Sequence, residues 1–256
     1  MKVVSLNANG IRSAIKKGLY TWIDTLKPDI ICIQETKAPL TELKDSIALE
    51  GYFLAFEDAQ KKGYSGVAIF SKQKPDEIKQ GFGDDFEDMD SEGRFVAMRF
   101  GKLWIASIYL PSGSSSVDRQ VIKMSALGRF RKLMQTFLKS SQDYILCGDF
   151  NIAHTKLDIK NWRGNQKSSG FLPEERAWVD DILEDGWVDG FRVINQEADQ
   201  YSWWSNRGQA YAKNVGWRID YHFVTPNLKD KIKDVSIFKD IKFSDHAPVI
   251  IEYDLV

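Results

Sequence analysis

The sequence contains few cysteines, carries almost no net charge and has no long apolar segment. Its only two cysteines among 256 residues are Cys32 and Cys147. Each lies inside an apolar, strand-like segment, which argues against a disulfide framework and a cysteine-based zinc site. The pattern instead predicts buried free thiols in a reducing compartment, and we therefore expect a cytoplasmic protein.

The lack of long apolar segments also bears on membranes. A membrane-spanning helix needs about 20 apolar residues, and no segment approaches that length. The N-terminus continues directly into a strand-like segment without the apolar core of a signal peptide, so we expect no membrane association.

The formal net charge is only −1, which by itself does not indicate a nucleic-acid partner. The charges are unevenly distributed, however: an acidic run at residues 84–92 contrasts with basic clusters at residues 12–17, 129–132 and 156–167. Such clusters are most often solvated surface, so their function depends on what lies near them.

Short β-rich segments alternate with helical patterns along the chain. Apolar spacing predicts one helix that carries Leu127, Phe130 and Met134, and another that begins at Pro173 and continues through Ile182. Several strands are apolar throughout, which is typical of strands covered on both faces. The sequence therefore predicts one α/β domain over residues 1–256, with two sheet-building halves divided near residue 140.

The closeness of three strands favours two sheets over a regular (βα)₈ barrel. GVAIFS, RFVAMRF and GKLWIASIYL follow one another without an intervening helix, and they predict an antiparallel meander.

Five strand-like segments are flanked by polar residues of catalytic types. Carboxylates, amides, a phenol and an imidazole occur together there, and no serine or cysteine nucleophile accompanies them. This combination predicts metal-assisted attack on phosphate, because hard oxygen ligands suit Mg²⁺. The residues are Asn7, Asn9, Glu35, Tyr109, Asp149, Asn151, Asp245 and His246.

Each of these residues also has a simpler structural explanation. Glu35 could pair with Lys37, Asp149 and Asn151 could form an Asx turn, and Tyr109 could be a buried strand tyrosine. It is the combination that favours a functional interpretation.

Histidines are scarce as well, with three in the chain. His246 has an adjacent carboxylate, Asp245, and a second candidate partner in Asp220. An aspartate would fix the imidazole tautomer, but spacing does not tell which one does so. His154 and His222 lack such company and are interpreted as structural.

Three tryptophans lie close to basic residues near the end of the chain. Aromatic side chains among cations can form a pocket for an exposed sugar or base and its phosphates. Strand alternation turns Trp203 and Trp204 to opposite faces, and Trp204 is the better candidate for the core. Trp217 follows, and the interleaved cations are Arg207, Lys213 and Arg218.

Six segments together resemble the motifs of the exonuclease III family of abasic-site endonucleases. They are LNANGIRS, IQETK, GDFNIAHTKLDIKN, GNQKSSGFLPEER, NVGWRIDYHF and SDHAP, and the resemblance extends from Val3 to Val256. GDFN and SDH mark only the wider endonuclease/exonuclease/phosphatase superfamily, whereas GFLPEER and NVGWRIDY are much more specific to the DNA-repair branch. The resemblance implies a four-layer α/β sandwich, with two packed mixed β-sheets flanked by helices.

The resemblance also implies roles for individual residues. The metal, Mg²⁺ or Mn²⁺ in its place, would be held by Glu35 with Asn7 and Asp245 near it. Asp149 would orient or activate water, and His246, paired with Asp220, would stabilise phosphoryl charge. The scissile phosphate would be contacted by Asn151 and Tyr109. An abasic sugar would lie against Trp203, Trp217 and Ile219, and the DNA backbone would contact Arg12, Lys16, Asn165 and Lys167.

Two positions depart from the family pattern. Asn9 stands where many members have Asp, which removes a negative charge near the metal, and Ser168 stands where many have a phosphate-binding Asn. Neither change removes a catalytic group, but both leave the balance of activities open.

The predicted function is that of a monomeric, Mg²⁺-dependent DNA-repair phosphodiesterase that hydrolyses double-stranded DNA on the 5′ side of abasic sites. One alternative is an enzyme that mainly trims blocked 3′ ends as a 3′-phosphodiesterase or 3′–5′ exonuclease. Two others are a phosphoesterase with a non-DNA substrate and an inactive nucleic-acid-binding module.

Overall fold

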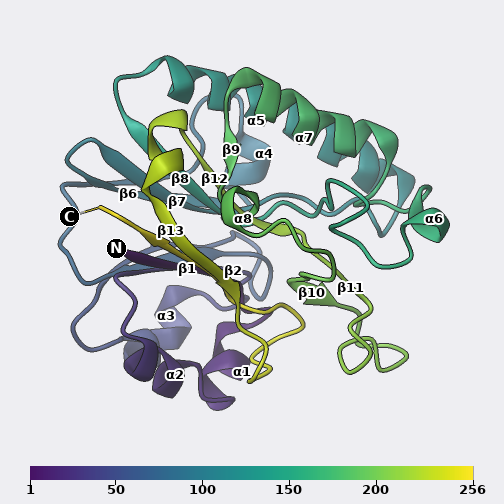
Figure 1. Cartoon of the computed structure of the whole chain (residues 1–256). Helices are drawn as coiled ribbons and strands as arrows, with labels where there is room; N and C mark the ends of the chain where they lie inside the picture. Colours follow the sequence, from purple (N-terminus) through teal and green to yellow (C-terminus); the bar gives the residue numbers. More distant parts are fainter. Residues whose placement is uncertain (256) are drawn as a thin grey trace.

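Two six-stranded mixed sheets pack face to face, and helices cover the outer face of each (Figure 1). The computed structural model describes residues 1–255, without the side chains of Lys44 and Asp45. The predicted four-layer α/β sandwich is confirmed. No helix within the described residues is long and apolar enough to cross a membrane.

The first sheet combines the two ends of the chain, in the order β13-β14-β1-β2-β4-β3. Its central strands β1 and β2 are parallel, and β14 pairs with β1 in antiparallel fashion. The strands are β1 (Lys2–Asn7), β2 (Ile30–Gln34), β3 (Phe53–Glu57), β4 (Val67–Ser71), β13 (Ile232–Ile237) and β14 (Val249–Tyr253).

The second sheet has the order β5-β6-β7-β8-β12-β9. Its central strands β7 and β8 are parallel, and β12 pairs with β8 in antiparallel fashion. The strands are β5 (Glu77–Gln80), β6 (Phe95–Phe100), β7 (Leu103–Tyr109), β8 (Asp143–Asp149), β9 (Val188–Asp189) and β12 (Asp220–Val224). A separate two-stranded ribbon consists of β10 (Trp203–Trp204) and β11 (Gly216–Trp217).

The two predicted helices are confirmed as α5 and α7. Helix α5 begins after Ser116, whose side chain accepts the backbone N–H of Arg119, and it buries Leu127, Phe130 and Met134. The other helices are shorter. The bounds are α1 (Ile11–Lys16), α2 (Leu19–Leu26), α3 (Leu40–Leu43), η1 (Lys44–Ile47), α4 (Glu87–Asp90), α5 (Val117–Lys139), α6 (Trp162–Asn165), α7 (Pro173–Asp185), α8 (Gly190–Ile194) and η2 (Pro226–Lys231).

Three apolar cores separate the four layers. One lies between the sheets, one under α1 and α2, and one under α5 and α7. Cys32 and Cys147 are free and fully buried in the core between the sheets, as predicted. The largely apolar strands β2 and β4 are buried at every position because both of their faces are covered.

Two predictions about strand order are wrong. The chain does not divide near residue 140: β1 to β4 and the last two strands form one sheet, and residues 77–224 supply the other. The three-strand meander is also wrong, because GVAIFS forms β4 in the first sheet while RFVAMRF and GKLWIASIYL pair as β6 and β7 in the second. Closeness in sequence favours pairing, but the turn after β4 instead carries the chain to the other sheet.

The register of the parallel strands brings the polar residues together. Asn7 is opposite Gln34 at the ends of β1 and β2, and Tyr109 is opposite Asp149 at the ends of β7 and β8. Asp220, which begins β12, is also opposite Asp149. Parallel strands end at the same edge of a sheet, so both sheets present their polar residues at one end of the sandwich.

Candidate active site

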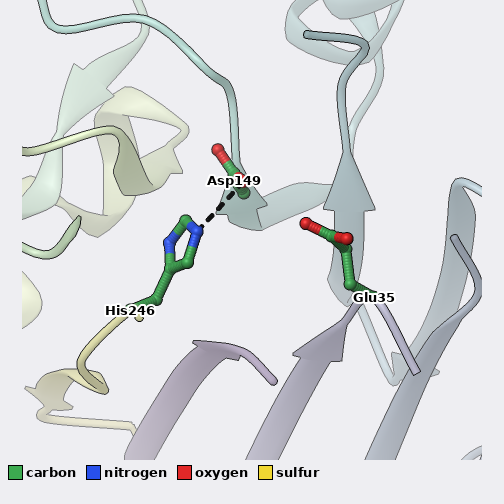
Figure 2. Close-up of side chains that lie close together, drawn as sticks. All are labelled: Glu35, Asp149 and His246. Carbon is green, nitrogen blue, oxygen red and sulfur yellow. Dashed lines mark ion pairs between the residues drawn. The ribbon is translucent and has the colours of Figure 1, made fainter. Parts of the chain in front are cut away.

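Three side chains from distant parts of the chain meet at this end of the sandwich. Glu35 follows β2, Asp149 ends β8, and His246 lies in the loop before β14 (Figure 2). One potential ligand atom from each lies within 4.8 Å of the others. The His246 Nε2 atom is 3.8 Å from Asp149 Oδ2. This group could hold a metal ion.

The backbone around the group adopts an uncommon conformation. Glu35 and Asn151 have φ values of 50° and 55°, and Asn9 and Lys37 also have positive φ. Positive φ is unusual for residues other than glycine, and it occurs often at functional sites, where surrounding contacts hold it. Here the turn after β2 is held by Gly10, whose N–H donates to the Glu35 carbonyl at 2.8 Å.

Asn7 connects the two carboxylates. Its Nδ2 donates to Glu35 Oε1 at 2.8 Å and to Asp149 Oδ2 at 2.9 Å. Its Oδ1 accepts the backbone N–H of Asn9, which fixes the orientation of the amide. In this orientation Asn7 offers donors to the carboxylates, and its role as a metal ligand stays a prediction.

Glu35 also forms the ion pair with Lys37 that the structural explanation envisaged, at 2.6 Å from Oε2. Glu35 can therefore pair with Lys37 and still belong to the cluster with Asp149 and His246, because its two carboxylate oxygens contact different partners.

The environment of Asp149 disfavours its charged form. The side chain is buried, and burial raises its pKa to about 7. The nearby carboxylates of Asp220 and Glu35 act in the same direction, whereas His246 opposes them. Asp149 can therefore exchange a proton near neutral pH, which suits a group that activates water.

Asp220 is the partner of His246. The His246 Nδ1 atom lies 2.9 Å from Asp220 Oδ2, and the buried Ser202 hydroxyl donates to the same carboxylate oxygen at 2.6 Å. Burial alone would lower the pKa of His246, but Asp220, with Asp149 and Asp245, outweighs it and raises the pKa to about 10. His246 is thus an imidazolium at neutral pH, and Nε2–H points toward Asp149 (Figure 2).

The Asp245 carboxylate forms hydrogen bonds with other residues than the adjacent His246 does. Asn9 Nδ2 donates to Oδ1 at 2.8 Å, and Trp203 Nε1 donates to Oδ2 at 3.2 Å. Burial raises the pKa of Asp245, but His246 and these two hydrogen bonds outweigh burial and lower it. Asp245 is not one of the three residues whose ligand atoms converge, and its place near a metal stays a prediction.

Tyr109 and Asn151 are next to the cluster. Burial, then the carboxylates of Glu35 and Asp149, raise the pKa of Tyr109 well above its ordinary value, so its hydroxyl stays a donor. Asn151 Nδ2 donates to the Leu110 carbonyl at 2.9 Å, and its backbone N–H donates to Asp149 Oδ1 at 2.8 Å, which is the Asx turn.

These residues line a cleft of about 740 Å³. Opposing charges share this cleft: two carboxylates suited to a cation, and an imidazolium and neutral donors suited to phosphate oxygens. Trp203, Trp217 and Ile219 form part of the same wall, and Lys167 lies at its rim.

The profile of the Endonuclease/Exonuclease/phosphatase family matches residues 4–246. The chain belongs to this family. A Bacillus subtilis protein named exodeoxyribonuclease is 37% identical over 254 residues, which cover 97% of this chain and 98% of that protein. A DNA-(apurinic or apyrimidinic site) endonuclease of Dictyostelium discoideum is 35% identical, with 100% of this chain and 71% of the relative covered.

Solved structures agree with these relatives. An AP endonuclease from Archaeoglobus fulgidus has a TM-score of 0.89 at 26% identity, with both chains fully covered. The resemblance to the exonuclease III branch of the Endonuclease/Exonuclease/phosphatase family is confirmed.

The aromatic residues lie as the alternation predicted. Trp204 is buried against Tyr201 and Ala210, whereas Trp203 is half-buried and faces the cleft. Trp203 and Trp217 are paired across the β10–β11 ribbon, with ring centres 6.0 Å apart and planes at 88°. Their contact with an abasic sugar stays a prediction.

The side chains predicted to contact the DNA backbone differ in exposure and in their contacts within the protein. Lys16 and Lys167 are exposed, whereas Arg12 is held by Glu42 at 3.0 Å. The Asn165 side chain donates to the Asn161 carbonyl and accepts from Ser168. Of the two exposed lysines only Lys167 lines the cleft, and the contact of all four residues with the DNA backbone stays a prediction.

Neither histidine interpreted as structural belongs to the cluster. His222 is buried beside Tyr253, and His154 Nε2 lies 2.6 Å from Asp180.

Sequence reasoning missed two features next to the site. Ser202 gives no recognisable signal, because its role depends on Asp220, 18 residues away. Lys123 did give one: it lies on the apolar face of α5, four residues before Leu127, where a cation is out of place.

Proposed function

We propose that this chain is a metal-dependent DNA-repair phosphodiesterase that hydrolyses the backbone of double-stranded DNA on the 5′ side of abasic sites. The observation that carries the proposal is the convergence of Glu35, Asp149 and His246 in a cleft that also has an aromatic wall. The named activities of the relatives support the substrate class. We further propose that the protein acts as a monomer and, because its two thiols are free, in the cytoplasm.

The carboxylate oxygens of Glu35 and Asp149 fit a hard cation, and we propose Mg²⁺, with Mn²⁺ as a replacement. Glu35 would be the principal ligand, because its side chain is partly exposed whereas that of Asp149 is buried. The ion would offset the negative charge of the scissile phosphate.

Side chains of the cleft would activate the water and stabilise the phosphate. Asp149 orients a water molecule and accepts its proton. His246, kept charged by Asp220, stabilises the negative charge that develops on the phosphoryl oxygens. Tyr109 and Asn151 donate hydrogen bonds to the same phosphate, and Asn7 fixes the distance between the two carboxylates.

A matched set of duplexes tests the function. The substrates are an abasic duplex, a nicked duplex with a blocked 3′ end, the same duplex undamaged, and a soluble inositol phosphate as a non-DNA phosphoester. We expect Mg²⁺-dependent cutting of the abasic duplex, much slower cutting with Asp149→Asn, and little turnover of the undamaged duplex. Faster turnover of the blocked 3′ end would make end trimming the main activity. Turnover of the inositol phosphate alone would contradict a DNA substrate.

Loss of an exposed lysine that contacts the DNA backbone is expected to weaken the salt dependence of DNA binding. Each phosphate contact contributes roughly 0.9 to the log–log slope of affinity against salt for duplex DNA. Lys167→Ala and Lys16→Ala should each reduce that slope by about this amount, while the preference for damaged DNA is retained. Lys102→Ala is the control, because this exposed lysine lies at the opposite end of the sandwich, in the turn between β6 and β7. Equal slopes in all four proteins would place the DNA on another face.

Opening the aromatic wall is expected to relax selectivity more than it slows chemistry. Extruding a nucleotide from the duplex costs a few kcal/mol, and the cost is lowest where the base is already missing. A narrow pocket beside the aromatic wall can therefore admit an abasic sugar and reject a full nucleotide. Trp217→Ala should narrow the single-turnover rate ratio between abasic and undamaged duplexes. Trp204→Phe, a change in the core, should lower the melting temperature and leave the ratio intact. An unchanged ratio in Trp217→Ala would reduce Trp217 to a packing residue.

A further inference from the structure

A fully buried ion pair lies directly behind the cleft. Lys123 of α5 and Glu175 of α7 both have side-chain exposures of 0%, and Lys123 Nζ is 2.6 Å from Glu175 Oε1. Burying two charges costs several kcal/mol per ion, and apolar residues of similar size are often as stable. Stability alone is therefore a weak reason for a lysine on the apolar face of α5.

The second contact of Lys123 reaches the site itself. Lys123 Nζ donates to the backbone carbonyl of Asn151 at 2.8 Å. Asn151 has the positive φ of 55°, a conformation that needs support from its surroundings. Its N–H is bound by Asp149 and its side chain by the Leu110 carbonyl, so Lys123 completes a three-point attachment of this residue.

Glu175 extends the same network to the wall of the cleft. Its Oε2 accepts the backbone N–H groups of Gly170 and Leu172, at 2.6 and 3.0 Å. Gly170 is packed so closely that an added Cβ would lie 3.0 Å from the Trp217 ring and 3.1 Å from the Asn151 carbonyl oxygen. One ion pair thus fixes both the end of β8 and the loop that supports Trp217.

We propose that Lys123 and Glu175 are positioning residues: Lys123 holds Asn151 so that its side chain meets the scissile phosphate, and Glu175 holds Lys123 and the 170–172 loop. This inference rests on the proposed function, because it assigns Asn151 to the phosphate. Neither residue touches the substrate. Lys123 acts through Asn151, so its loss matters only while the Asn151 side chain is present.

A double-mutant cycle tests this dependence. Lys123→Met with Glu175→Gln removes both charges together, and the glutamine oxygen can still accept the Gly170 and Leu172 N–H groups. We expect this pair variant to lose roughly 10- to 100-fold in single-turnover rate at saturating DNA, because small misplacements of catalytic groups are costly. When the same two substitutions are introduced into the Asn151→Ala variant, the single-turnover rate should fall by less than a further threefold.

The matched control is Arg131→Met. Arg131 joins the same two helices through Asp185 at 2.7 Å, farther along α5 from the cleft. It should lower the melting temperature and leave the rate unchanged. All rates are measured well below each variant's melting temperature. If the pair variant does not fold, Lys123→Arg replaces it, because arginine keeps the charge opposite Glu175 and shifts only the donor.

Two results would overturn the proposal. One is a folded pair variant with the wild-type rate, and the other is a loss that multiplies fully with that of Asn151→Ala, as expected of a purely structural ion pair. The cycle uses whichever phosphodiester substrate the wild-type protein turns over fastest. Failure of the wild type on abasic DNA would therefore count against the proposed function, and an additive cycle against the positioning role alone.

Discussion

Replacing Asp149 or His246 with asparagine is expected to slow single-turnover cleavage at least 100- to 1000-fold, which is about the cost of removing one preorganised group. Asp149→Asn removes the carboxylate that we propose accepts the proton of the attacking water. His246→Asn removes the imidazolium that Asp220 keeps charged, and with it the strongest fixed positive charge next to Asp149. Asp149→Asn preserves the shape of the side chain and His246→Asn shortens it, and neither residue is a proposed DNA-backbone contact, so DNA affinity should change far less than the rate.

The double variant distinguishes a shared mechanism from two independent contributions. His246 Nε2 faces Asp149 Oδ2, and each residue shifts the pKa of the other. Groups that act as a unit are strongly non-additive, so the double variant should lose less than the product of the two single losses. Full multiplicativity in single-turnover rates would contradict the shared mechanism. His154→Asn is the matched control, because His154 pairs with Asp180 outside the cluster, and it should retain the wild-type rate.

Glu35→Gln is expected to lower turnover by about 100-fold or more at ordinary Mg²⁺ concentrations, with DNA binding largely retained. The substitution removes one negative charge with little change in size, and Mg²⁺ relies on few carboxylates, so each should matter. The amide oxygen can still accept the hydrogen bond from Asn7, which preserves the contact between the ends of β1 and β2.

The test for Glu35 is a Mg²⁺ titration of the cleavage rate. Glu35→Gln should recover part of its activity at high Mg²⁺, because the loss lies in ion affinity. Glu77→Gln is the control, since this exposed carboxylate of β5 pairs with Arg99 outside the cluster, and its titration should match that of the wild type. Wild-type activity of Glu35→Gln at ordinary Mg²⁺ would refute the assignment.

The site shows how far local reasoning reaches. The residue types at the strand ends were sufficient to predict metal-assisted phosphate chemistry, because Glu35, Asp149 and His246 each follow or precede a recognisable strand. Sequence spacing did not decide between Asp220 and Asp245 as the partner of His246. The structure decides it: Asp220 begins β12 and is held opposite Asp149 by strand pairing, whereas the carboxylate of Asp245 turns toward Asn9 and Trp203.

Lys123 is a second residue whose partners could not be predicted from the sequence. Its position on the apolar face of α5 was visible in the sequence, but its partners were not. Glu175 lies 52 residues away on another helix, and the Asn151 carbonyl belongs to a backbone turn that no side-chain pattern describes.

The sequence by itself determined the elements and the chemistry. Helices α5 and α7, the buried strands, the free thiols and the polar strand ends all follow from periodicity and residue type, which depend on neighbours a few positions away. Only the tertiary structure decided which sheet each strand joins. β14 pairs with β1 from the opposite end of the chain, and β4 pairs with β2 in the first sheet although β6 is closer in sequence. Such choices are settled by the burial of whole sheet faces, and contacts of that range leave no local pattern in the sequence.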